Sequence, residues 1–185
     1  MIPDLPIETD RLLLRAYAPG DVDDLYAFES LPEMHRYVYS VPRTRDQVAT
    51  MVAERAGRTV LTAEGDFLGL VVELRETGTV IGTVVLKWAS AEHRQGEIGY
   101  ALHPAYHGKG LALEAATPLL RLGFEGLGLH RMYGRIDGRN TASAKLLERL
   151  GMRREAHLVQ NEFVKGEWTD EMVYAVLASE WRSSS

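Results

Sequence analysis

A chain of 185 residues, 45% apolar and 25% charged, has the size and composition of one globular domain. Its formal net charge of −5 argues against broad nucleic-acid binding, which requires a basic surface, and is compatible with a cationic substrate such as an amine. The absence of cysteine excludes disulfides, thiolate metal sites and cysteine nucleophiles.

The first third of the chain contains the signals of one strand and two helices. Its start, MIPDLPIETDR, has neither the basic nor the apolar region of a signal peptide, and no apolar run reaches the roughly 18 residues of a membrane helix. We therefore expect a soluble cytoplasmic protein. Residues 11–15 (RLLLR) predict a short buried strand, and a helix is expected after the turn at Pro19. Residues 45–58 predict an amphipathic helix, and the aromatic-rich segment 34–42 before it is irregular.

Three strands are expected in the middle of the chain. Residues 67–74 and 80–88 are rich in β-branched and apolar residues and are separated by a turn that contains Gly78. Residues 97–102 (EIGYAL) alternate with period two, which places Ile98, Tyr100 and Leu102 on one face and Glu97 on the other.

The remaining third alternates helix and strand before it ends in a hairpin. Residues 110–124 have a helical pattern that Pro118 should kink, and a strand is expected at 133–137. Residues 141–150 predict a helix with Asn140 as its N-cap. Residues 158–163 and 172–177 flank a Lys-Gly-Glu turn, and only the final SSS has the composition of a disordered end. This order of elements predicts an α+β fold around a mixed sheet.

Residues 106–112 (YHGKGLA) place two glycines where a helix must start. A helix start presents unpaired N–H groups, and glycine allows a bulky anion to approach them, so this loop suits a phosphate or pyrophosphate. The loop does not fit the P-loop pattern, and it fails the dinucleotide fingerprint because position 113 is Leu. A tight turn without a ligand remains the alternative.

Several blocks of the sequence, in order, resemble the GCN5-related N-acetyltransferase (GNAT) superfamily, and within it the ribosomal-protein N-acetyltransferase (RimJ/RimL-like) branch. The loop HGKGLA is similar to the [RQ]xxGx[GA] motif, with His107 in place of the usual Arg or Gln, and GEIGYALHP resembles the strand before it. The other blocks are IETDRLLLRAYAPGDVDDLY, TGTVIG, RNTASAKLLERLGM and VKGEWTDEMVYAV, which extend the match from about residue 7 to residue 176.

The resemblance implies a single GNAT domain over residues 1–185, with a mostly antiparallel sheet of about seven strands, a splayed parallel pair and about four helices. It also implies acetyl-CoA as co-substrate and no metal. The pantetheine arm would pair with the backbone of Tyr100, Ala101 and Leu102 between the splayed strands 97–102 and 133–137, and Asn140 would bond the same arm. The pyrophosphate would lie on the amides of His107, Gly108, Lys109, Gly110, Leu111 and Ala112.

Acetyl transfer to an amine requires a neutral nucleophile, a donor to the thioester oxygen and stabilisation of the departing thiolate. Glu97 lines the expected cleft, where related enzymes place a carboxylate, so we expect it to act as general base through a water; a solvated strand-edge carboxylate is the alternative. Ser143 matches the NxxS position of the family and is expected to donate a proton to the thiolate, unless it only bonds the helix backbone. The amide near Ala101 or Leu102 would polarise the thioester carbonyl.

The remaining candidates concern the acceptor and the phosphates. We expect Met34, Tyr37, Tyr39 and Trp88, with the terminal hairpin, to hold the acceptor amine, although these aromatic residues also suit a plain hydrophobic cluster. We expect Tyr100 to be a core side chain, and Lys109 is a candidate to bind the phosphates of CoA. The histidines have no metal-ligand spacing.

The resulting hypothesis is an N-acetyltransferase that acts on a protein or peptide N-terminal α-amino group by direct attack in a ternary complex. The alternatives are acetylation of a polyamine, amino acid or aminoglycoside, a catalytically silent acyl-CoA-binding module, and nucleotide binding through the glycine loop. No nucleic acid or membrane is expected as a partner, and pairing of edge strands in the terminal hairpin leaves a homodimer as an option.

Overall fold

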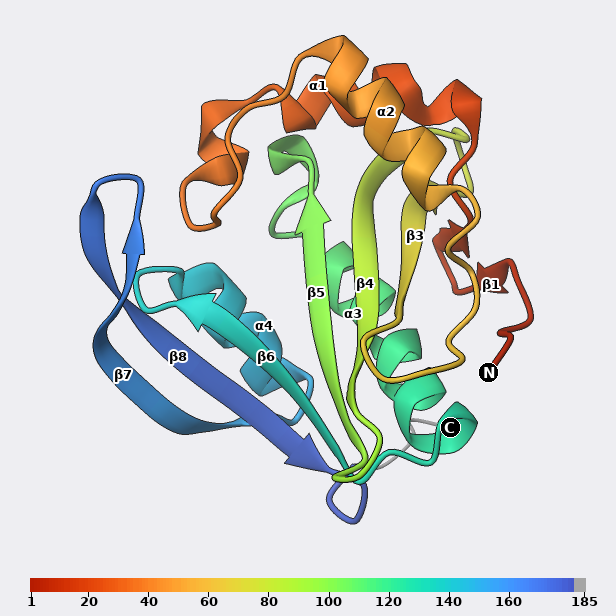
Figure 1. The fold of residues 1–185 in the computed structure, drawn as a ribbon. Helices are drawn as coiled ribbons and strands as arrows, with labels where there is room; N and C mark the ends of the chain where they lie inside the picture. The colour runs from red at the N-terminus through yellow and green to blue at the C-terminus, as the bar shows by residue number, and fades with distance from the viewer. Residues whose placement is uncertain (182–185) are drawn as a thin grey trace.

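One eight-stranded sheet, in the order β1-β2-β3-β4-β5-β6-β8-β7, organises the chain (Figure 1). The computed structural model describes residues 1–181; the final SSS lies outside the described residues. The strands are β1 (Ile7–Glu8), β2 (Leu12–Arg15), β3 (Phe67–Leu74), β4 (Val80–Ser90), β5 (Gln95–Leu102), β6 (Arg131–Asp137), β7 (Arg153–Val164) and β8 (Glu167–Leu177). The expected fold class is confirmed, with one strand more than the expected seven, since β1 has only two residues and shows no alternation in the sequence.

Helices cover both faces of this sheet. They are α1 (Val22–Glu29), α2 (Arg45–Arg55), α3 (Leu111–Arg121) and α4 (Thr141–Arg149). Both faces of β3 are buried, which explains why its sequence is apolar and does not alternate. Leu70 and Val72 belong to the main core with α3, whereas Val71 packs with α1 and α2 on the other face. Figure 1 shows α1 and α2 together above one end of the sheet, and α3 and α4 behind it.

Two helix ends differ from the sequence prediction. The helix α2 stops at Arg55, three residues before the expected end. The helix α3 continues through Pro118 to Arg121 and then changes to a π-helical turn, Leu122–Gly126. The irregularity expected at Pro118 therefore appears one turn later.

The feature that positions the site is the pairing of β5 with β6. These strands are the parallel pair, and they pair only from Gln95 to Glu97 on β5 and from Arg131 to Tyr133 on β6. Beyond these residues the two strands diverge, as Figure 1 shows. On its other edge β5 stays paired with β4 up to Leu102. The expected splayed pair is therefore present, and it leaves one edge of β5 without a strand partner from Ile98 onward.

Candidate active site

The open edge of β5 presents the main chain of alternate residues. The His103 N–H donates to Ile81 of β4 at 2.8 Å, and the Ala101 oxygen lies against Gly82 of β4, so the odd-numbered residues face β4. By alternation the peptide groups of Ile98, Tyr100 and Leu102 face β6. The sequence offered the N–H groups of Ala101 and Leu102 as donors to the thioester carbonyl. The N–H of Leu102 lies on the open edge, whereas that of Ala101 points toward β4 within the sheet.

The glycine loop follows at the end of β5 and presents free donors. Gly108 and Gly110 have φ values of +75° and +78°, which glycine adopts without strain. Within residues 1–181, the N–H groups of residues 108–112 donate to no protein acceptor. Gly110 is the N-cap of α3, so these donors lie at the positive end of an eleven-residue helix. The loop therefore fits a diphosphate.

The loop is anchored from the turn between β1 and β2. The Arg11 guanidinium donates to the Lys109 carbonyl at 3.0 Å and forms an ion pair with Glu114 of α3 at 2.7 Å. Thr9 donates to the same carboxylate at 2.6 Å. Burial alone would raise the pKa of Glu114, but these hydrogen bonds outweigh it and lower the pKa below its ordinary value. This anchor holds one carbonyl of the loop away from the free N–H groups.

His107, the departure from the family motif, is engaged with protein. Its N–H donates to the Pro104 carbonyl at 3.0 Å. Its Nε2 lies 2.7 Å from the Leu102 carbonyl, so Nε2 carries the proton. The main-chain donor of His107 is thus used within the turn, and its ring ties the end of β5 to the glycine loop.

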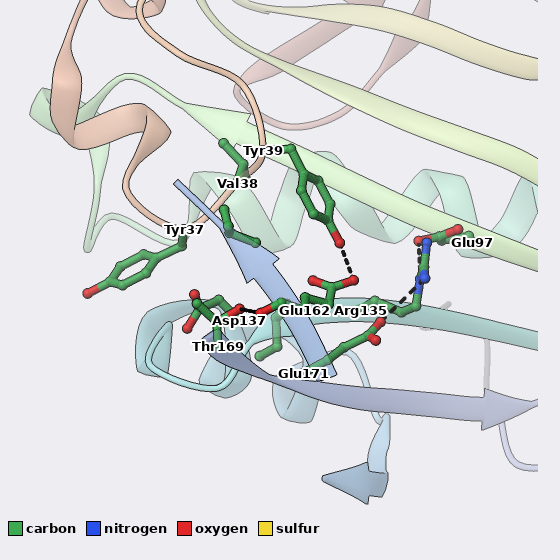
Figure 2. A pocket seen from close by; sticks show the side chains of 11 residues that line it. Tyr37, Val38, Tyr39, Glu97, Arg135, Asp137, Glu162, Thr169 and Glu171 are labelled. Carbon is green, nitrogen blue, oxygen red and sulfur yellow. Dashed lines mark hydrogen bonds and ion pairs between the residues drawn. The ribbon is translucent and has the colours of Figure 1, made fainter. Parts of the chain in front are cut away.

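A cavity of about 130 Å³ lies on the other side of the strand gap, and Figure 2 shows its lining. It is bordered by the loop between α1 and α2, by β5 and β6, and by the β7–β8 hairpin. Its lining residues are Tyr37, Val38, Tyr39, Glu97, Arg135, Ile136, Asp137, Glu162, Val164, Thr169 and Glu171. Four carboxylates and one guanidinium therefore line the cavity, and one of the carboxylates, Asp137, is paired with Arg139 at 2.7 Å.

Arg135 connects two of these carboxylates. Its Nε donates to Glu97 Oε1 at 3.1 Å, and its Nη1 lies 3.4 Å from Glu171 Oε1 (Figure 2). Asn161 donates to the second oxygen of Glu171 at 2.7 Å. The Arg135 contact uses Glu97 Oε1, and the Tyr133 hydroxyl also interacts with this carboxylate, so a water or an ammonium would share Glu97 with these two side chains.

The carboxylates of the cavity help to raise the pKa values of two tyrosines, Tyr39 and Tyr133. The hydrogen bond to Glu162, together with burial, raises the pKa of Tyr39 to about 12. Burial and the nearby charge of Glu97 raise the pKa of Tyr133. Both phenols therefore stay protonated near neutral pH, and the Tyr39 hydroxyl donates to Glu162 across the mouth of the cavity (Figure 2).

A bulge in β7 places Glu162 in the cavity. The register with β8 shifts by two residues between Leu158 and Glu162, so Glu162 lies opposite Thr169. Without this shift it would lie opposite Glu167, next to the turn. Asp170 stabilises the bulge by accepting from the Gln160 N–H at 2.9 Å and from His157 Nε2 at 2.6 Å.

The first turn of α4 carries the other expected catalytic residue. Asn140 is the N-cap, as predicted, and its Oδ1 accepts from the Ser143 N–H at 3.1 Å. The Ser143 Oγ lies 2.7 Å from the Tyr100 hydroxyl. Tyr100 therefore links the open strand β5 to the helix that follows β6.

The structure separates the residues expected to hold the acceptor. Tyr37 and Tyr39 line the cavity beside Glu97. Met34 packs instead against the core under α1 and α2, and Trp88 packs against the main core with its Nε1 donating to the Ser90 carbonyl. Lys109 lies with its Nζ 5.1 Å from the centre of the Tyr106 ring, on the glycine-loop side.

The sequence prediction missed four charged residues of the cavity: Arg135, Asp137, Glu162 and Glu171. A signal existed for the first two, because period two on β6 puts them on the face of Tyr133, which pairs with Glu97. No local signal existed for the other two, since their position depends on the β7 bulge.

The described residues contain no cluster of His, Asp or Glu able to hold a metal ion. No helix between residues 1 and 181 is long and apolar enough to cross a membrane.

Comparison with known proteins agrees with this geometry. The family model "Acetyltransferase (GNAT) domain" matches residues 11–153. The chain belongs to the GNAT acetyltransferase family. It is 32% identical to the uncharacterized N-acetyltransferase p20 of Bacillus licheniformis over 94% of this chain and 96% of the relative. The chain is accordingly an N-acetyltransferase, and acetyl-CoA is the acetyl donor of this GNAT family.

Solved GNAT structures superpose over nearly the whole chain. The GNAT-family acetyltransferase from Bacillus anthracis has a TM-score of 0.84 at 30% identity, covering 95% of this chain and all of the other. The spermidine N-acetyltransferase from Vibrio cholerae, solved with CoA and spermine, has a TM-score of 0.76 at 25% identity, covering 93% and 98%.

Proposed function

We propose that this GNAT enzyme transfers the acetyl group of acetyl-CoA to a primary amine of a compact cationic acceptor, of the polyamine type, bound in the cavity beside Glu97. The observation that carries the proposal is the lining of that cavity, which holds the carboxylates of Glu97, Asp137, Glu162 and Glu171 and one guanidinium, that of Arg135. Arg139 pairs with Asp137 at 2.7 Å, and the carboxylates still outnumber the two cations. Such a lining attracts ammonium groups and repels anions. A polyamine brings several ammonium groups, whereas a peptide N-terminus brings one.

On the donor side, the proposal assigns the diphosphate to the free amides of residues 108–112 and the pantetheine arm to the open edge of β5 at Tyr100 and Leu102. Asn140 uses its Oδ1 within α4, which leaves its Nδ2 hydrogens for the arm. His107 contributes by bracing the loop against Leu102, since its own N–H is occupied.

Three of the chain's groups then serve the reaction. Glu97 takes a proton from the acceptor ammonium, directly or through a water, so that a neutral amine attacks the thioester. The main-chain N–H of Leu102 is the candidate donor to the carbonyl oxygen as it gains charge. The Ser143 hydroxyl donates a hydrogen bond to the sulfur of CoA as the C–S bond breaks. Transfer is direct within one ternary complex, because the amine and the thioester meet across the strand gap.

An N-terminal α-amino group of a protein or peptide is the second candidate. Two observations favour it: the sequence resembles the ribosomal-protein branch of the family, and Val38 and Tyr39 at the cavity mouth are 45% and 67% exposed. These side chains offer a surface for the residue that follows a peptide N-terminus.

The test is a turnover assay with acetyl-CoA, read as free thiol, over a panel of polyamines, diamines, amino acids, aminoglycosides and short peptides. We expect turnover with polyamines, with a Km that increases with ionic strength because exposed charges are screened by salt. Preference for peptides would select the second candidate. Tight CoA binding without turnover of any amine would identify a silent acyl-CoA-binding module and refute the proposal.

A further inference from the structure

Tyr100 occupies a position on β5 beyond the last residue paired with β6. Its side chain reaches the first turn of α4, where its hydroxyl lies 2.7 Å from Ser143 Oγ and 3.3 Å from the Ser143 carbonyl oxygen. The Ser143 N–H is held by Asn140 at 3.1 Å. Ser143 is thus fixed from the helix side by one contact and from the strand side by another.

Either hydroxyl can donate in the 2.7 Å contact, and one of the two arrangements has Tyr100 as the donor. Burial raises the pKa of Tyr100 to about 12, so the phenol keeps its proton at neutral pH. Its short contact is with Ser143 Oγ, and a proton donated along that contact leaves the Ser143 hydrogen to point elsewhere. Within residues 1–181 Ser143 Oγ has no second hydrogen-bond partner. With Tyr100 as the donor, the Ser143 hydrogen is therefore free to face the gap.

We propose that Tyr100 is a positioning residue, whose hydroxyl donates to Ser143 and thereby directs the Ser143 hydrogen toward the departing sulfur. This inference rests on the proposed function. As the C–S bond breaks, its electron pair stays on the sulfur, and the Ser143 hydroxyl stabilises that charge by donating a hydrogen bond. Glu97 releases to water the proton that it took from the ammonium, and after the attack it takes the second proton from the nitrogen. The thiolate later takes a proton from water, so Tyr100 and Ser143 keep their charge states.

A packing role for Tyr100 is separable from this one, because its ring also contacts the main core. Tyr100→Phe keeps the ring and removes only the hydroxyl. We expect kcat to fall about 5- to 10-fold, the value of one lost hydrogen bond, with the Km for acetyl-CoA within about twofold of wild type. Tyr26→Phe, which removes a hydroxyl from the outer face of α1, is the matched control and should leave kcat unchanged.

A double-mutant cycle decides whether the hydroxyl acts through Ser143. Tyr100→Phe combined with Ser143→Ala should be no slower than Ser143→Ala alone, because Tyr100 then has nothing to direct. Losses that multiply, or a Tyr100→Phe enzyme with wild-type kcat, would overturn the inference while wild-type turnover still supported the proposed function. A wild-type chain without turnover would overturn the proposed function, and the inference with it.

Discussion

Replacing Gly110 by Val tests the glycine loop, because its φ of +78° is a left-handed conformation in which a Cβ is strained. The space itself is open: a Cβ at Gly110 would meet only an Arg11 nitrogen, at 3.6 Å. The cost of the substitution is therefore conformational, and a left-handed L-residue costs roughly 1–2 kcal/mol. The variant loop can escape this cost by rotating its peptide groups.

The same cost sets the expected loss of affinity. If binding of the CoA diphosphate requires the left-handed conformation, the variant must recover it on binding, and about 1–2 kcal/mol corresponds to a roughly 5- to 30-fold higher Km for acetyl-CoA. The Km for the acceptor should change little. Gly110→Asn should lose less, since Asn tolerates this conformation better than other residues.

Steady-state kinetics with varied acetyl-CoA measure the effect, and isothermal titration with CoA separates affinity from turnover. Gly57→Val is the control, because Gly57 is exposed, has no positive φ and has nothing within 4 Å of an added Cβ. An unchanged Km in a folded Gly110→Val enzyme would refute the reasoning, because the loop would then not hold the cofactor.

Four further predictions follow from the site. Glu97→Gln should lower kcat by about 10²- to 10⁴-fold, the usual contribution of a general base, whereas a kcat equal to that of the wild type would remove Glu97 as the base. Glu162→Gln should raise the Km of a polyamine about 3- to 10-fold at similar kcat, and the exposed Glu92→Gln serves as its control; equal Km values for both would place the acceptor elsewhere. Ser143→Ala should slow turnover with CoA affinity nearly intact, and full activity would return Ser143 to a helix-start role. Glu114→Gln should lower the free energy of unfolding by about 1–2 kcal/mol at pH 7. Because the pKa of Glu114 is lowered in the folded protein, this difference between variant and wild type should be complete above the ordinary pKa of 4.5 and should shrink as the pH falls below it. Urea titrations measure the difference, and one that persists at pH 3 would contradict this linkage between protonation and stability.

The parts of the fold with local signals were predictable from the sequence. A run of apolar and β-branched residues predicted β3 with its bounds, and the capping pattern predicted α4 behind Asn140. Two glycines before an apolar-periodic segment predicted the loop with free amides. These features depend on residues within a few positions of one another, so the sequence determines them locally.

The acceptor cavity was predictable only in part. Glu97 and Tyr39 come from segments that are distant in the sequence and become neighbours through the sheet order and the loop between α1 and α2. Glu162 enters through the register shift in β7, which has no glycine or proline to mark it. Trp88 was expected in the cavity because it ends a strand, but the apolar ring gains more by packing against the core.

The central claim is that the free amides of residues 108–112 hold the diphosphate of CoA. Amide NMR spectra of ¹⁵N-labelled protein, titrated with CoA and separately with pantetheine, test it directly. The account predicts large shifts of the Gly108 and Gly110 signals with CoA and small ones with pantetheine, which lacks the diphosphate. Saturating CoA that leaves both glycine signals in place would contradict it.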